Sequence, residues 1–184
     1  MLKSMVSSAL AVVVAVGAAS AAQAQTTAEP FIGPSVGYHS VDTGKDGLGN
    51  DLPNAEGAII GVVGGVDMPL GSGNAFVGVE GNYHFGTGDI DREYGAAVRL
   101  GTRMSPSSKI YLKGGYQEVN YDIGNWIGDT EVEDDTLPYD DTDGGWLVGL
   151  GGDFDMSPST ALRLNADTIE FDSARVTAGL AFKF

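Results

Sequence analysis

The chain has 184 residues, enough for one ordinary domain, and 25 acidic against 10 basic residues give it a formal net charge of −15. This balance argues against a nucleic-acid partner, because phosphate binding requires a basic surface. The chain contains 28 glycines but is 42% hydrophobic and only 19% charged, which is too apolar for a disordered chain. It has no cysteine, so disulfides, thiolate metal sites and a cysteine nucleophile are excluded.

Residues 1–24 are typical of a cleaved signal peptide. Lys3 supplies a short positive start, an apolar stretch follows at residues 9–19, and Ala22-Gln23-Ala24 forms an A-x-A cleavage site. The apolar stretch is too short for a transmembrane helix, which needs about 20 residues. We therefore expect Sec-type export and a mature chain of residues 25–184 that forms one barrel domain.

The mature sequence predicts eight β-strands, because stretches of alternating apolar and polar residues recur between turn-forming residues. The predicted strands are residues 31–40, 57–68, 75–85, 92–104, 110–121, 145–156, 161–168 and 174–184. Short connections alternate with longer or more polar ones. This pattern predicts an all-β fold, an eight-stranded antiparallel up-and-down barrel with two different ends.

The two faces of the strands decide the environment of the barrel. A soluble lipocalin-like barrel would enclose the apolar face and bind a small apolar ligand, whereas a transmembrane barrel would turn that face toward lipid. Bulky residues such as Val98 and Leu100 oppose Gly95, Arg99 and Gly101. Eight strands leave room only for side chains, so inward glycines would make space for long charged ones. We therefore favour the transmembrane barrel and keep the lipocalin-like barrel as the alternative.

The inward charges are predicted to pair in the lumen. Folding each hairpin about its turn brings together three pairs: Glu80 with Arg99, Arg163 with Asp153 or Asp155, and Asp167 with Arg175. A buried charge needs a partner, and opposite charges across a strand pair stabilise it. The alternative is solvated surface pairs, which contribute little. The predicted lumen charges are Glu80, Arg99, Arg103, Lys113, Asp153, Asp155, Arg163, Asp167 and Arg175.

Three apolar residues depart from the alternation. Ile59 and Val63 fall on the inward face of the second predicted strand, and Leu147 does so in the sixth. Either the lumen is apolar at these places or the strands contain a β-bulge.

Aromatic residues on the apolar face gather at the two ends of the predicted barrel, as expected for girdles at lipid–water interfaces. One band contains Tyr38, Tyr83, Phe85, Tyr94, Tyr116 and Trp146, and the other contains Phe154, Phe182 and Phe184.

The last eight residues, TAGLAFKF, resemble the carboxy-terminal β-signal of bacterial outer-membrane barrels. The residues in this motif are Thr177, Gly179, Leu180, Phe182 and Phe184. With the signal peptide and eight strands, the mature chain resembles the small eight-stranded outer-membrane barrels, the group of the OmpA membrane domain, OmpX and the opacity-type porin-family proteins. The resemblance implies the outer membrane of a Gram-negative bacterium, contact with its lipid and lipopolysaccharide, and recognition of Phe182 and Phe184 by the barrel-assembly machinery.

No catalytic arrangement is evident. The chain has only two histidines, His39 and His84, and both are predicted to point into the lumen. A lipid A-modifying barrel enzyme, the third alternative, needs a serine and a histidine within hydrogen-bond reach, and no motif arranges them. We expect a structural or surface-interaction role, no catalysis, no cofactor and at most a narrow pore.

Residues 122–144 form an acidic segment without a basic residue. Crowded carboxylates suit hard cations, but their spacing does not match a calcium-binding loop. We expect no specific metal site and favour a solvated loop whose like charges repel one another. The alternatives are weak bridging by divalent ions to lipopolysaccharide and contact with an unidentified surface ligand. Its acidic residues are Asp122, Asp129, Glu131, Glu133, Asp134, Asp135, Asp140, Asp141 and Asp143.

Overall fold

The structure is a computed structural model that describes residues 28–42, 44, 54–121 and 142–184. The predicted signal peptide and most of the acidic segment lie outside the described residues. No helix among the described residues is long and apolar enough to cross a membrane.

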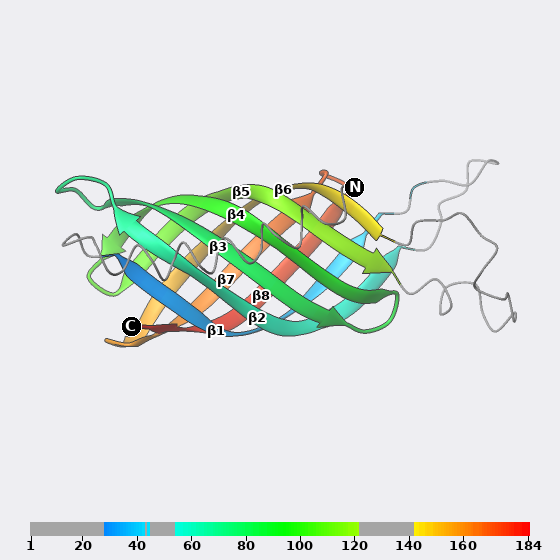
Figure 1. The fold of residues 1–184 in the computed structure, drawn as a ribbon, viewed down its shortest axis with the longest axis horizontal. Helices are drawn as coiled ribbons and strands as arrows, with labels where there is room; N and C mark the ends of the chain where they lie inside the picture. Colours follow the sequence, from blue (N-terminus) through cyan, green and yellow to red (C-terminus); the bar gives the residue numbers. More distant parts are fainter. Residues whose placement is uncertain (1–27, 43, 45–53, 122–141) are drawn as a thin grey trace, which may run out of the picture.

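Within the described residues, eight antiparallel strands close into one barrel (Figure 1). Each strand pairs with its neighbours in the sequence, and β8 pairs with β1 to complete the circle. The predicted all-β, up-and-down barrel is confirmed. The strands are β1 (Glu29–Val41), β2 (Ala55–Pro69), β3 (Ala75–Gly86), β4 (Ile90–Ser105), β5 (Ser108–Tyr121), β6 (Thr142–Ser157), β7 (Thr160–Ile169) and β8 (Ser173–Lys183).

Most strands extend one to three residues beyond their predicted limits. The backbone ladder continues into polar residues such as Glu29, which pairs with Asp67, and Ser105, which pairs with Ser108. The alternation of apolar residues therefore underestimates the length of the strands, because it marks only the part of each strand whose outward face is apolar.

The barrel has two different ends. We call the end that holds Glu29 and Phe184 the terminal end, and it carries the three short turns β2–β3, β4–β5 and β6–β7. The opposite end, the loop end, carries the connections β1–β2, β3–β4, β5–β6 and β7–β8. In Figure 1 the label C marks the terminal end, and strands cross the long axis of the barrel at an angle.

Side chains alternate between lumen and exterior along each strand, as the period of two requires. In β7, Arg163 and Asn165 are buried while Leu162 and Leu164 are exposed. Exposed side chains elsewhere include Leu112, which is 67% exposed. The exterior is apolar and the lumen is polar, which is the reverse of a lipocalin-like barrel, so nothing supports that alternative.

Inward glycines provide the space that the charged side chains occupy. A Cβ atom at Gly149 would overlap the carboxylate of Asp167, its partner across β6 and β7. A Cβ at Gly78 would overlap the carboxylate of Asp67 in the same way.

The apolar residues that departed from the alternation line the lumen, and no bulge is needed to explain them. Ile59 and Val63 are 2% and 6% exposed, and the register of β2 runs without a shift against both neighbours. Ile59 packs against Ile90 and Val119. Leu147, 2% exposed, packs in a second apolar cluster further along the lumen.

Candidate functional site

The centre of the lumen is built around the guanidinium of Arg99, which has no exposed surface. Its Nη1 donates to Glu80 Oε2 at 3.0 Å, and its Nη2 lies 3.2 Å from Asp67 Oδ2 and 3.4 Å from Asp153 Oδ2. These carboxylates come from β3, β2 and β6, so one side chain of β4 ties together three other strands.

Arg163 forms the second half of this centre. Its Nε and Nη2 donate to the two oxygens of Asp153 at 2.8 Å and 2.7 Å, a two-point geometry that is stronger than a single contact. The two residues face each other directly across β6 and β7. Asp153 is therefore the partner of Arg163, while Asp155 pairs with Lys183 at 2.7 Å.

Aromatic rings separate and cover these guanidinium groups. The Cζ of Arg99 lies 3.9 Å from the ring centre of Tyr111, and the Cζ of Arg163 lies 3.8 Å from that of Phe31. Such stacking favours a cation over the face of the ring. Phe31, Phe76 and Tyr111 were not among the predicted site residues, although their position on the inward face was readable from the alternation.

The network continues toward the loop end through alternating charges. Lys113 Nζ lies 3.0 Å from Glu80 Oε1 and 3.1 Å from Asp167 Oδ2. Arg175 then bridges Asp167, at 2.9 Å, and Glu93, at 2.6 Å. Each buried charge thus has at least one opposite charge within contact distance.

A pair of histidines surrounds Glu93. His39 Nδ1 donates to Glu93 Oε2 at 2.8 Å, and His84 Nδ1 lies 3.3 Å from Glu93 Oε1. Glu93 and His39 have no exposed surface, and His84 is 2% exposed. Glu93 was missed because its partner of opposite charge, Arg175, lies on β8 and not in the same hairpin.

The network ends at the terminal end with less buried groups. Lys109 Nζ lies 3.1 Å from Asp67 Oδ2 and also contacts Glu29. Arg103 donates to Glu29 as well. Arg103 and Glu29 are about one-third exposed, so this end of the lumen approaches water.

All nine predicted lumen charges face the lumen and lie within contact distance of an opposite charge. Five charged members were not predicted, because they pair around the barrel and not within one hairpin. These are Glu29, Asp67, Glu93, Lys109 and Lys183.

The lumen network, as we call these fourteen residues, is electrically balanced. Among the described residues it contains seven acidic and seven basic side chains. The remaining 18 acidic residues, 25 less seven, fall in the sequence within or beside the connections β1–β2, β3–β4, β5–β6 and β7–β8. In the sequence these connections and strand ends hold only two basic residues, Lys45 and Arg92, so the excess of negative charge in the mature chain comes from them and not from the lumen network.

The predicted girdle residues all lie on the exterior. Tyr83 and Tyr94 stack with 6.1 Å between ring centres, and Tyr116 meets Trp146 edge to face at 6.0 Å. A further exposed aromatic, Phe171, lies at the β7–β8 turn and was not predicted. The remaining predicted girdle residues are Tyr38, Phe85 and Phe154.

The residues of the β-signal divide between the two faces. Thr177 points into the lumen, where its Oγ1 accepts from Asn165 Nδ2 at 3.3 Å, while Phe182 and Phe184 are 45% and 79% exposed. Gly179 and Leu180 are partly buried.

In the described part of the chain, no group of three or more histidine, cysteine, aspartate or glutamate side chains is arranged to hold a metal ion. The acidic residues 122–141, which were the other candidates for cation binding, lie outside the described residues.

Two solved structures share this fold. Neisserial surface protein A is 13% identical, with a TM-score of 0.50 over 86% of this chain and 99% of that one. The N-terminal β-barrel domain of Pseudomonas aeruginosa OprF is 11% identical, with a TM-score of 0.50 over 87% of this chain and 100% of that one. A search of the curated proteins found no match. The sequence model of the family described as "Outer membrane protein beta-barrel domain" matches residues 8–184, and the chain therefore belongs to this family.

Proposed function

We propose that the mature chain is an integral outer-membrane protein with a structural or surface-interaction role and no catalytic activity. The observation that carries this proposal is the lumen network, which fills a barrel whose exterior is apolar. A transmembrane barrel turns its apolar face toward lipid and its polar face toward the lumen. The charges enclosed in the lumen then need partners, and here each is neutralised by a neighbour. The loop end faces the cell exterior, and the terminal end faces the periplasm.

The burial of the network argues against a wide pore. Arg99, Glu93, His39 and Gln117 have no exposed surface, although they lie at different heights of the lumen. A water-filled passage past these residues would expose some of their atoms. We expect at most a narrow path that opens when the network rearranges.

The geometry of the histidines supports a non-catalytic role. An activated serine or threonine requires a hydrogen bond to its base. Within the described residues, neither His39 nor His84 is hydrogen-bonded to such a hydroxyl, and both are turned toward Glu93.

Export and assembly would depend on two segments, the predicted signal peptide and the β-signal. Residues 1–24 would direct Sec-type export and be removed, and the β-signal would be recognised by the barrel-assembly machinery. Closure of β1 against β8 matters because an open strand edge in lipid leaves backbone groups unsatisfied at several kcal/mol each.

Deleting Phe184 tests the recognition step. Its ring is 79% exposed, so it adds little to packing, and the purified variant should refold in detergent like the wild type. Its level in the outer membrane should nevertheless fall. Unchanged membrane levels would contradict recognition of this residue, and failure to refold would assign it a structural role.

The surroundings of the barrel are outer-membrane lipid and lipopolysaccharide. The exterior aromatic bands support this, because aromatic rings favour the lipid–water interface. Acidic residues of the loop end would meet an unidentified surface ligand, or divalent ions bound to lipopolysaccharide.

The decisive experiment expresses the full chain and fractionates the cells. We expect the mature protein in the outer membrane, running faster on unheated than on heated gels because the barrel stays folded in detergent. Planar bilayers containing the pure protein should show little or no steady conductance. Recovery from the soluble periplasmic fraction would refute the membrane role, and a large steady conductance would refute the filled lumen.

A further inference from the structure

The pairing of β1 with β8, which closes the barrel, is interrupted near its middle. We call this pairing the closing seam. In the register of the described strands, Gly33 and Pro34 have no partner on β8, and pairing resumes at Ser35, opposite Gly179. On their other side, both residues pair with β2 in an unbroken register. The interruption is therefore confined to the closing seam.

Proline explains the interruption, because its backbone nitrogen carries no hydrogen. Along an antiparallel strand, every second residue directs its backbone groups toward the same neighbouring strand. Pro30 O accepts from Phe184 N at 3.2 Å, so Pro34, four residues further on, also faces β8, where it lies opposite Leu180. The carbonyl of Leu180 therefore receives no hydrogen bond from β1. Proline is normally confined to edge strands, strand starts and bulges.

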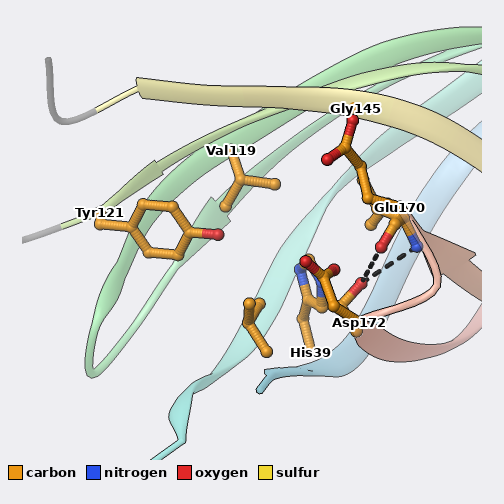
Figure 2. Close-up of a pocket in the computed structure, with 9 residues that line it drawn as sticks. His39, Val119, Tyr121, Gly145, Glu170 and Asp172 are labelled. Atoms are coloured by element: carbon orange, nitrogen blue, oxygen red, sulfur yellow. Dashed lines mark hydrogen bonds between the residues drawn. The ribbon is translucent and has the colours of Figure 1, made fainter. Parts of the chain in front are cut away.

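Both ends of the closing seam are held by further hydrogen bonds. The bond from Phe184 N lies at the terminal end. At the loop end, Asp42 N donates to Asp172 O at 2.8 Å, and Ser173 Oγ is hydrogen-bonded to the backbone N and O of Ile169 at 3.0 Å and 3.2 Å. Figure 2 shows this end, with His39 on β1 and Asp172 on the turn before β8. The weak part of the seam is thus its middle.

The lumen wall at the interruption carries no charge. Separating β4 from β5 would expose the buried charges of Arg99 and Lys113, which is costly without their partners. Separating β1 from β8 near Pro34 would expose only small, uncharged inward residues and so costs less. These residues are Gly33, Ser35, Thr177, Gly179 and Ala181.

We propose that the folded barrel opens locally at the middle of the closing seam, around Pro34 and Leu180, while both ends of the seam stay paired. The opening is lateral, because it connects the lumen with the apolar exterior through the barrel wall. The missing hydrogen bond lowers the free energy needed to separate the two strands there. The hydrogen bonds at the two ends keep the separation from spreading into unfolding of the barrel.

The test measures amide hydrogen exchange by NMR in the folded mature protein in detergent micelles at neutral pH. The amides of Val36 and Leu180 point into the middle of the closing seam, and those of Leu100 and Leu112, directly opposite each other on β4 and β5, serve as the reference. We expect protection factors about tenfold lower in the seam, the ratio expected for one lost hydrogen bond. Equal protection at the two places would overturn the proposal.

Restoring the missing N–H should close the seam. Pro34→Val gives β1 a donor for the Leu180 carbonyl and a side chain that suits strands, so the protection of Leu180 should rise about tenfold, to the level of the reference. Pro34→Ala restores the same N–H with a smaller side chain, and it decides the question if the valine variant does not fold. Pro69→Val is the matched control, because Pro69 ends β2 away from the seam, and it should leave the protection of Leu180 unchanged.

Two further outcomes would refute the proposal. If Leu180 exchanges as fast in both Pro34 variants as in the wild type, the missing N–H is not the cause. If Tyr38 and Phe182, nearer the two ends of the seam, are as poorly protected as Leu180, the seam opens as a whole and not locally. Gel mobility of unheated samples checks that each variant is folded, so failure of this proposal is distinguished from failure of the membrane role.

Discussion

The lumen and the loop end differ in their charge: the lumen is balanced, and the connections of the loop end are strongly acidic. The lumen network contains seven acidic and seven basic residues, whereas the sequence within and beside the connections of the loop end holds 18 acidic residues against two basic ones, Lys45 and Arg92. Burial explains the difference, because an unpaired charge is costly in the lumen but is solvated and screened at an exposed end. Net charge alone therefore says little about a barrel interior.

The same contrast predicts where substitutions change the stability of the barrel. A buried ion pair offsets much of its attraction by lost hydration, so the lumen network is weak evidence for a very stable barrel. Removing one partner is different, because the other charge then remains buried alone. We expect large effects from single substitutions in the lumen and small effects at the loop end.

The largest effect is expected for Arg99→Met. The change leaves Asp67, Glu80 and Asp153 without their shared cation, and the free energy of unfolding should fall by about 3–5 kcal/mol. Arg92→Met is the control, since Arg92 is 48% exposed and its pair contributes about 0–1 kcal/mol. Urea unfolding in lipid vesicles measures both. Equal losses would show that burial does not govern the cost.

Leu164→Arg tests the barrel wall that separates the polar lumen from the apolar exterior. Leu164 is 44% exposed near the middle of β7, beside the buried Arg163. An arginine on the lipid face should cost about 2–4 kcal/mol at the bilayer midplane. Leu100→Arg on β4 should behave alike. If Leu164→Arg folds into vesicles as well as the wild type, the assignment of the faces is wrong.

Much of this organisation was predictable from the sequence because strands have a period of two. The pairs Asp153–Arg163 and Asp167–Arg175 were predictable since each joins strands of one hairpin. Glu93 with Arg175 was not, because the two residues are 82 positions apart and meet only when the barrel closes.

A moderate effect is expected from Gly149→Ala. The added methyl would overlap the carboxylate of Asp167 in the filled lumen, and overpacking of this kind costs about 1–3 kcal/mol. The matched control is Gly114→Ala on the neighbouring strand, where the nearest atom to the new Cβ would be 3.9 Å away. The control should be neutral or slightly stabilising. Unfolding midpoints in urea distinguish the two, and a cost at Gly114 equal to that at Gly149 would argue against a filled lumen.

The smallest effect is expected at the loop end, where Phe171→Gly should stabilise the barrel. Glu170 and Phe171 have φ angles of 55° and 68°, the left-handed pair of a type I′ turn, which favours asparagine and glycine. A left-handed residue other than glycine costs about 1–2 kcal/mol, and the greater freedom of an unfolded glycine offsets about 0.5–1 kcal/mol. Phe171 is 78% exposed, so removing its ring sacrifices little packing.

We therefore expect Phe171→Gly to raise the free energy of unfolding by about 0.5–1 kcal/mol, measured in urea with detergent-solubilised protein. Phe171→Ala is the control, because it removes the ring but keeps the unfavourable φ, and it should change stability little. A gain with alanine equal to that with glycine would locate the cost in the exposed ring instead of the backbone. A loss with both would mean that the ring makes a stabilising contact, and the loop end would then resemble the lumen in contributing to stability.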